Sequence, residues 1–337
     1  MRQVWGHVPA NLLADYITAE RDPVRALIVV GGNPVMAIPG EDRLREAFPR
    51  LELLVTIDLY RSATAELSDY VLPASDWLER ADVRNGGVCV IPTAQYSDAV
   101  VDPIGDRADD SWILGRIEQE LGLPSMLDHP ETGPEAMIEA MLAGQGTSIE
   151  ELRSLPTHTK VLPPRESRPV EEVVAHPDGR VDCCPSSFAP VIERAHAIFE
   201  ELECEAPDGL KLIQWRNRRQ HNSWGRRLMP RLREGRFAHN PLFLNPEDAA
   251  ARGLADGDPI TVRSASGAVD TVVGLDPALR RGVVALSHGY GERWASDSSG
   301  TEVGVNVNRL LPSGHGSYEW YSNMAHMVGI PVEVLRR

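Results

Sequence analysis

The sequence predicts an α/β chain in two unlike parts, a partial doubly wound parallel-sheet domain followed by a mostly-β barrel. Three observations predict it. Continuous apolar runs alternate with helical segments in the first part. Short strand-like runs separated by turns fill the second part. The first part is strongly acidic and the second is slightly basic. Residues 1–205 carry 17 basic and 36 acidic side chains, whereas residues 206–337 carry 17 and 13. Continuous apolar runs are typical of strands that are covered on both faces.

Strands and helices alternate near the start of the chain. Strands are predicted at 26–30, 51–57 and 70–72, with helices at 41–48 and 61–67 between them. Such an alternation favours parallel pairing with right-handed crossovers. Further helices are predicted at 109–121, 134–142 and 188–202.

The middle of the chain has the composition of a connector between two domains. Residues 143–186 are rich in Pro, Glu and Thr and show little periodicity, and the prolines within 162–169 are typical of an extended segment. We therefore expect a partial α/β domain at 1–125, a helical and extended connector at 126–206, and a β-barrel domain at 207–337.

Short strands dominate after residue 207. They are predicted at 210–213, 242–244, 259–263, 269–273 and 283–286. One helix lies among them, with Asn245 as N-cap and Pro246 at its first position. Gly257-Asp258 and Ser266-Gly267 are typical of hairpin turns.

Composition excludes several classes of protein. A net charge of −15 argues against a general nucleic-acid coat. No apolar run approaches the roughly 18 residues of a membrane span, and no signal-peptide core follows Met1. The four cysteines form no C-x-x-C pattern, so we expect no metal ligands among them. A cytoplasmic protein is expected.

Two strand ends carry candidate nucleotide contacts. Gly31, Gly32, Asn33 and Pro34 follow the first strand, where glycines let a ligand approach the backbone. Asp58 ends the second strand, at a place where a carboxylate commonly pairs with a base or sugar. An ordinary strand-to-helix turn and a helix N-cap are the alternatives. The two features together favour a nucleotide site.

A basic segment stands out in the second part. Nine basic residues between Lys211 and Arg236 face a single acid, Glu234. Within it, a run of hydrogen-bonding and stacking side chains suits phosphates and flat rings. That run contains Arg216, Gln220, His221, Asn222, Ser223 and Trp224. A solvated basic loop is one alternative, and a single-stranded RNA patch is another that the acidic remainder disfavours.

Three more residues are candidates near the end of the chain. Asn306 and Asn308 flank a small apolar residue and could line one wall of a polar heterocycle. His288 is expected on a flexible turn after the last clear strand. A lone histidine is more often structural than catalytic, and no nucleophile elbow, Walker loop or H-E-x-x-H pattern is present.

Taken in order, these segments resemble the C-terminal half of the molybdopterin-dependent oxidoreductases of the dimethyl sulfoxide reductase superfamily, which includes formate dehydrogenases and nitrate reductases. The matching motifs are Gly31 to Pro34, Val55 to Asp58, Thr64 to Ala74 with Glu79, His221 to Trp224, Asn245 to Ala249, Gly253 to Asp258, Gly282 to Val284 and Gly304 to Asn308. Their order and spacing carry the resemblance.

The resemblance implies a molybdopterin dinucleotide-binding, double-psi-like barrel in the second part. It also implies a bis-molybdopterin guanine dinucleotide cofactor with molybdenum or tungsten. By motif, Gly32, Asn33, Asp58 and Thr64 would hold one guanine nucleotide. The other candidates would hold parts of the pterin and pyrophosphate: Arg216, His221, Asn222, Ser223, Trp224, Asn306 and Asn308.

The family's N-terminal portion, with its cysteine-rich iron–sulfur motif and metal-ligating residue, has no counterpart in the sequence. We therefore expect a C-terminal portion that is inactive alone, with a missing N-terminal half or a separate subunit as partner and a small molecule as substrate. The alternative is a non-catalytic interaction protein that keeps the fold and docks an anionic or protein partner.

Overall fold

The computed structural model of the chain describes residues 6–85, 91–123, 134–164, 168–174, 176–206, 208–218, 220–223, 235, 238–292 and 304–337. The chain divides into two compact units. Unit 1 contains residues 1–56, 61–70 and 186–337, and unit 2 contains 57–60 and 71–185. The units therefore do not follow the chain order, because the first strands and the barrel belong to the same unit.

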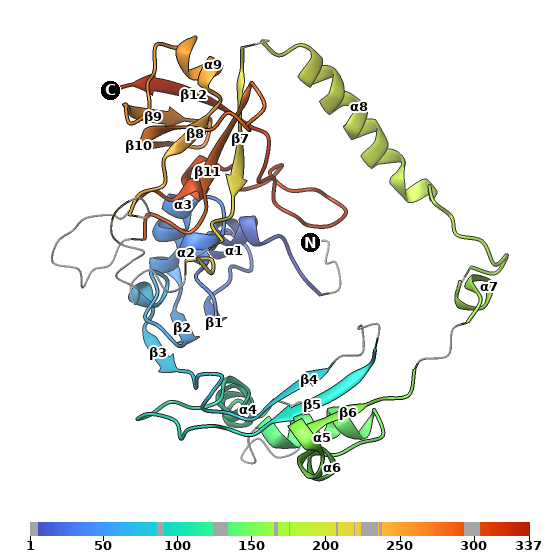
Figure 1. The fold of residues 1–337 in the computed structure, drawn as a ribbon. Coiled ribbons are helices and arrows are strands. Elements are labelled where there is room, and N and C mark those ends of the chain that lie inside the picture. Colours follow the sequence, from blue (N-terminus) through green and yellow to red (C-terminus); the bar gives the residue numbers. More distant parts are fainter. Residues whose placement is uncertain are drawn as a thin grey trace. The chain divides into compact units, whose positions relative to one another are not determined.

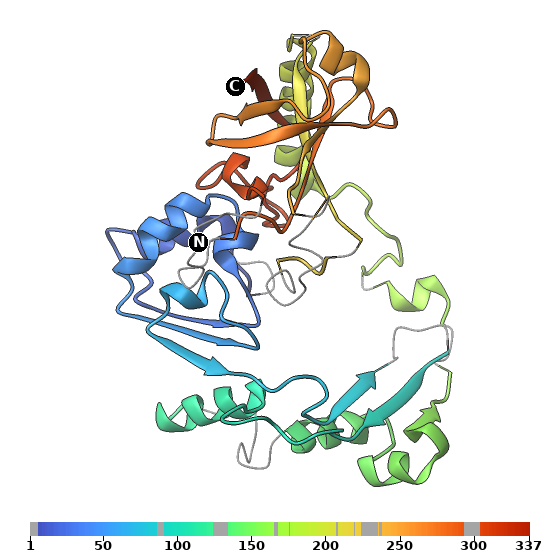
Figure 2. The ribbon, with the colours of Figure 1, turned by 60° about the vertical axis from the view of Figure 1, so that its left-hand side comes forward.

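A parallel sheet opens the structure. It has the order β1-β2-β3, from β1 (Ala26–Val30), β2 (Leu53–Asp58) and β3 (Tyr70–Pro73). The backbone amides of Asp69 and Ala74 donate to the carbonyls of Leu54 and Asp58, so β3 runs in the direction of β2. Figure 2 shows these strands in blue beside their helices. The chain crosses from unit 1 to unit 2 within β2.

Short helices cover one side of β1 and β2. They are η1 (Ala10–Leu12), α1 (Leu13–Ile17), α2 (Pro34–Ala37), α3 (Glu41–Ala47), η2 (Phe48–Arg50) and η3 (Ala65–Leu67). The core beneath them contains Val29, Met36, Leu44 and Leu54, each buried. Apolar residues recur at helical spacing in α1 and α3, and burial of these faces stabilises helices that are too short to persist alone.

The second core of unit 1 is a closed six-stranded barrel, in the order β10-β8-β11-β7-β12-β9 (Figure 1). Its strands are β7 (Leu210–Trp215), β8 (Leu242–Leu244), β9 (Pro259–Arg263), β10 (Ala268–Leu275), β11 (Val283–Ser287) and β12 (Ile330–Arg336). Two pairs are parallel, β7 with β11 and β8 with β10, and β9 and β10 form an antiparallel hairpin.

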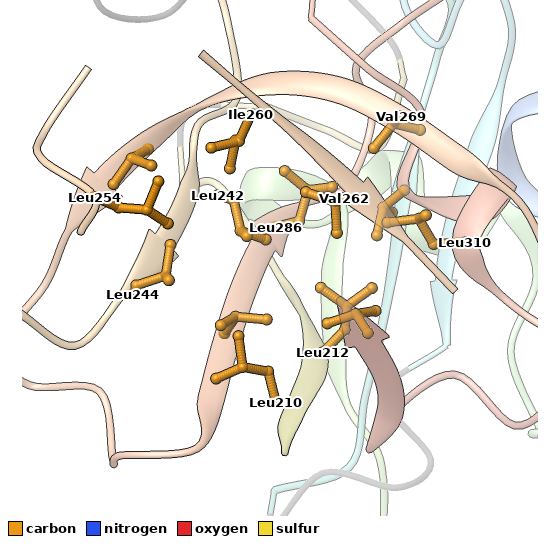
Figure 3. Close-up of a cluster of buried hydrophobic side chains, with 14 of the residues drawn as sticks. Leu210, Leu212, Leu242, Leu244, Leu254, Ile260, Val262, Val269, Leu286 and Leu310 are labelled. Carbon is orange, nitrogen blue, oxygen red and sulfur yellow. The ribbon is translucent and has the colours of Figure 1, made fainter. Parts of the chain in front are cut away.

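Alternate residues of these strands fill the barrel. Leu212, Leu242, Ile260 and Leu286 are completely buried and point into the same interior (Figure 3). The period of two matches a strand with one face in a core. The helix α9 (Pro246–Ala250) begins as predicted, because the Asn245 side chain accepts from the Glu247 amide at 2.9 Å.

Unit 2 is built on an antiparallel sheet in the order β4-β5-β6, from β4 (Asp82–Asn85), β5 (Thr93–Ser97) and β6 (Thr159–Val161). Its helices are α4 (Asp110–Glu120), α5 (Pro134–Ala143), α6 (Ile149–Ser154) and η5 (Pro156–His158). Tyr96, Leu142 and Leu152 are buried in its core. Residues 134–162, expected to be connector, thus supply a large part of this core.

The return to unit 1 is almost entirely exposed. It contains α7 (Val170–Val173), η6 (Ser186–Phe188) and α8 (Ala189–Glu203), none of which has a buried residue. Among the described residues, no helix is both long and apolar enough to cross a membrane.

The predicted fold class is confirmed, since a parallel sheet and a closed barrel are both present. One predicted helix is wrong in extent. Of residues 61–67, only Ala65–Leu67 are helical. The amides of Ala63 and Thr64 donate to side chains elsewhere in unit 1 instead of facing solvent at a helix start, and the chain is extended again at Ser68.

Candidate functional site

The loops after β1 and β2 are joined through Asn33. Its Oδ1 accepts from the Thr64 amide at 3.2 Å and from Thr64 Oγ1 at 2.9 Å. Thr64 Oγ1 also accepts from the Val35 amide at 3.2 Å. Asn33 is 6 % exposed and Thr64 is fully buried. The predicted nucleotide residues 33 and 64 are therefore in direct contact within unit 1.

A third segment reaches the same place from the barrel. Oε1 of Glu292, which follows β11, accepts from Asn33 Nδ2 at 2.8 Å and from the Ala63 amide at 2.9 Å. Asn33 Nδ2 also lies 3.3 Å from Ser223 Oγ, in the predicted pterin segment. Glu292 was not predicted from the sequence. It is one of 49 acidic residues, and its only signal is its place directly after Gly291 in a glycine-rich turn.

The glycines before Asn33 leave room at the strand end. Gly31 has φ of +56°, a conformation that glycine adopts without strain, and a Cβ there would meet nothing within 4 Å. Gly32 is half-buried, and Pro34 begins α2. An open backbone at the carboxyl end of a parallel strand can receive a ligand at close range.

Asp58 ends β2 with one oxygen unused. The Tyr60 amide donates to its Oδ1 at 3.1 Å, whereas its Oδ2 is buried and has no hydrogen-bond partner among the described residues. Burial raises the pKa of this carboxyl, and the bonds from the Tyr60 and Leu59 amides oppose that rise. A buried acceptor without a partner is costly unless a ligand or water supplies a donor.

Part of the basic segment is organised around a turn. Arg216 donates to the Asn222 side chain, and Gln220 Nε2 donates to the Gly289 carbonyl. Asn222 has φ of +52°, which asparagine tolerates better than most residues. A Cβ on Gly289 would lie 2.2 Å from the Asn222 carbonyl oxygen. Only glycine fits at position 289, so the 220–222 turn packs against the end of β11.

Other residues of that segment differ in exposure. His221 is exposed and Ser223 is half-buried. Trp224 and most of the basic cluster, at 219, 226–227, 231, 233 and 236, lie outside the described residues.

Asn306 and Asn308 are engaged inside the protein. Asn306 Nδ2 donates to Glu41 Oε2 at 2.9 Å, and its Oδ1 accepts from the Asn308 amide at 3.1 Å. Asn308 Nδ2 donates to the Met36 carbonyl, and its Oδ1 accepts from Gln214 Nε2 at 3.2 Å. Both side chains are almost completely buried. They fasten α2 and α3 to the barrel, a role that sequence periodicity could not indicate.

His288 lies in the bend that directly follows β11, where the sequence predicts a turn. It is 9 % exposed, and its amide donates to the Trp215 carbonyl at 3.0 Å. Burial lowers its pKa, and the positive charge of Arg216 lowers it further. Its Nδ1 is buried without a partner among the described residues. Burial and the nearby Arg216 therefore both favour the neutral form of the imidazole.

Comparison with known proteins identifies the family. The model of the molybdopterin oxidoreductases matches residues 3–120, and that of the molybdopterin dinucleotide-binding domain matches residues 210–319. The chain belongs to the molybdopterin oxidoreductase family. Its second matched region contains five of the six barrel strands, β7 to β11, and ends before β12.

Individual relatives agree with this membership. The chain is 25 % identical to the probable oxidoreductase YyaE of Bacillus subtilis, over 88 % of this chain and 43 % of that protein. It is 25 % identical to acetylene hydratase of Syntrophotalea acetylenica, over 87 % and 40 %. It is 26 % identical to dimethyl sulfoxide/trimethylamine N-oxide reductase of Rhodobacter capsulatus, over 82 % and 36 %. The chain spans less than half the length of these relatives.

A solved structure shows the same fold. Acetylene hydratase from Pelobacter acetylenicus superposes with a TM-score of 0.78 at 22 % identity, over 98 % of this chain and 46 % of that one. Within the described residues, no group of three or more His, Cys, Asp or Glu side chains could hold a metal ion.

Proposed function

We propose that this chain binds the guanine dinucleotide form of the molybdopterin cofactor and completes a molybdenum or tungsten redox site. The observation that carries the proposal is the buried Oδ2 of Asp58, which has no hydrogen-bond partner among the described residues, in a chain of this family. A carboxylate oxygen accepts N–H donors such as those on a guanine edge. The open backbone at Gly31 also fits a ligand at a strand end.

The proposed contacts follow the family's motifs. Around a guanine nucleotide we place Gly31, Gly32, Asn33, Pro34, Asp58 and Thr64. Around the pterin and pyrophosphate we place Arg216, Gln220, His221, Asn222, Ser223, Trp224 and His288, with Asn306 and Asn308 supporting this wall from inside the protein. Arg216 would bind phosphate oxygens with its planar guanidinium, and neutral His288 would exchange a hydrogen bond through Nδ1.

The chemistry belongs mostly to the cofactor. When bound, its metal would supply two-electron oxidation or reduction of a small molecule. The residues of this chain would bind the dinucleotide tails, orient them and exclude water from the phosphates. In this proposal two molybdopterin guanine dinucleotides bind one metal ion. The metal's protein ligand and an iron–sulfur cluster come from an N-terminal half or a separate subunit.

Pterin extraction tests the proposal. The chain is produced in a host that makes the cofactor, and the pterin released on denaturation is measured by fluorescence. We expect pterin in the wild type and its loss in Asn222→Ala and Asn308→Ala. Asn11→Ala is the matched control, because Asn11 is 2 % exposed and its amide donates to the Ser317 carbonyl at 2.8 Å. A wild type without pterin would contradict the proposal.

The second candidate is a non-catalytic interaction protein with the same fold. One observation favours it: α8 has no buried residue and exposes Ile192, Phe199 and Leu202 along its length. This candidate predicts a folded chain that either carries no pterin or keeps the same pterin content when Asn222 is replaced by Ala. The same extraction therefore separates the two functions.

A further inference from the structure

The Asn33 side chain has no hydrogen-bonding capacity to spare. A primary amide offers two N–H donors and an oxygen with two lone pairs. Nδ2 donates to Glu292 Oε1 at 2.8 Å and to Ser223 Oγ at 3.3 Å, and Oδ1 accepts two bonds from Thr64. A direct ligand contact by this side chain would have to displace one of the four bonds.

These bonds join three segments that are far apart in sequence. Asn33 belongs to the loop after β1, Ala63 and Thr64 to the loop that follows β2, and Glu292 to the segment that follows the barrel strand β11. A single oxygen, Oε1 of Glu292, accepts from both loops, from Asn33 Nδ2 and from the Ala63 amide. The barrel therefore holds both strand-end loops through one carboxylate.

The orientation of the Asn33 amide depends on that carboxylate. An ionised carboxylate only accepts, so Asn33 must turn Nδ2 toward Glu292 and Oδ1 toward the two donors of Thr64. Glu292 is 7 % exposed and Ala63 is fully buried. Hydrogen bonds to a charged acceptor are strong where water is excluded. A reversed amide would present its oxygen to Glu292 and its donors to the Thr64 amide.

We infer that Glu292 is a positioning residue for the strand-end site. By fixing the Asn33 amide and the Ala63 backbone, it holds loops 31–34 and 62–65 in the shape that receives the guanine nucleotide. Asn33 then acts on the ligand through the backbone of its loop, not through its side chain. The inference rests on the proposed function for the identity of the ligand, but the contacts that carry it lie wholly within unit 1.

Exchanging the amide and the carboxylate tests the inference. Asn33→Asp keeps Oδ1 for Thr64 but sets a second buried carboxylate against Glu292. We expect at least a tenfold loss of affinity for the probe, anaerobically released molybdopterin guanine dinucleotide, and a lower unfolding midpoint. Both losses should shrink between pH 8 and pH 5, because two adjacent carboxyl groups can share one proton. The double variant Asn33→Asp/Glu292→Gln should bind the probe more tightly than Asn33→Asp alone, since the introduced amide removes the second charge and can donate to the introduced carboxylate. Recovery should be incomplete, because the nitrogen that donates to the introduced carboxylate cannot also accept from the Ala63 amide.

Two controls separate positioning from general damage. Asn11→Asp places the same charge at another buried amide of unit 1, and Asp248→Asn neutralises another buried carboxylate, whose Oδ2 accepts from the Gly282 amide at 2.7 Å. Neither should change probe affinity by more than about twofold. If Asn33→Asp does not fold, Glu292→Gln alone should weaken binding about threefold to tenfold while it changes the unfolding midpoint little.

The outcomes are distinct. Binding by the wild type, with loss in Asn33→Asp and partial recovery in the double variant, supports the inference. Binding by the wild type with additive losses in the two single variants overturns the inference and leaves the proposed function standing. A wild type that does not bind the probe overturns the proposed function, and the inference with it.

Discussion

Asn306 Nδ2 donates to Oε2 of Glu41 at 2.9 Å, across 265 positions of sequence, and both side chains are 2 % exposed. This bond fastens the start of α3 to the segment that follows the barrel strands. Glu41 Oε1 also accepts from Arg45 Nε at 2.8 Å, so its charge is shared between an amide and a guanidinium. The bond from Asn306 links α3 to the barrel segment within unit 1.

That relationship predicts a large effect of one added charge. Asn306→Asp should lower the free energy of unfolding of unit 1 by about 3 kcal/mol, because a second carboxylate would replace the donor beside buried Glu41. Denaturant unfolding measures the difference. Ser266→Asp, which adds the same charge at an exposed residue of unit 1, is the control. Equal stability of the two variants would show that the Asn306 amide does not hold the structure together.

The environment of Glu79 should make the free energy of unfolding decrease at acid pH. The Asp76 amide donates to its Oε2 at 2.8 Å, and the Ile104 amide and Arg107 donate to its Oε1. These bonds, led by that from Asp76, hold its pKa below the ordinary 4.5 against the opposing effect of burial. The stabilisation is therefore present above about pH 4.5 and is lost as pH falls through the lower folded value.

The variant Glu79→Gln should thus unfold at a lower temperature than the wild type at pH 7, and the gap should close in acid. Thermal unfolding at about pH 7, 4.5 and 3 measures it. A gap that stays constant across this range would contradict the depressed pKa.

His288 predicts a loss of stability in mild acid. Burial and Arg216 lower the pKa of His288 in the folded protein below the ordinary 6.5. The unfolded chain therefore binds a proton at this residue at a higher pH than the folded protein does. Stability should fall as pH decreases from about 6.5 toward the lower folded value. His288→Gln should weaken this dependence, seen as a smaller shift of the unfolding midpoint between about pH 7.5 and 5.5. An identical shift in variant and wild type would refute the prediction.

Replacing Asp58 by Asn should raise the stability of the protein and lower its binding of the cofactor. Burial raises the pKa of Asp58 above the ordinary 3.8, so its ionised form costs stability at neutral pH. Asp58→Asn should raise the free energy of unfolding at pH 7 by about 1 kcal/mol, as is common when a functional charge is removed. This gain should vanish below about pH 3.8. The same variant should lose bound pterin, whereas a gain in stability with unchanged pterin would separate Asp58 from the cofactor.

Local sequence rules predicted most of the barrel. Strands around Leu242, Ile260 and Val284 show uninterrupted or alternating apolar residues, and Asn245-Pro246 marks the start of α9, because these signals depend on near neighbours. The sheet of unit 2 was missed, since β6 is only three residues long and α6 buries only Ile149 and Leu152. Such short elements exist only through tertiary packing.

The candidate site was predicted in part. Gly31, Asn33 and Asp58 stand out because parallel strand ends collect ligand-binding residues. Glu292 could not be selected, because its role depends on two loops more than 200 residues away. Asn306 was selected by residue type, and its bond to Glu41 is a tertiary contact that spacing along the chain does not encode.

Direct titration of the purified chain with molybdopterin guanine dinucleotide under anaerobic conditions tests the central claim. We predict saturable binding by the wild type, at least tenfold weaker binding by Asp58→Asn, and unchanged binding by Asn11→Ala. A folded wild type that shows no saturable binding would contradict it.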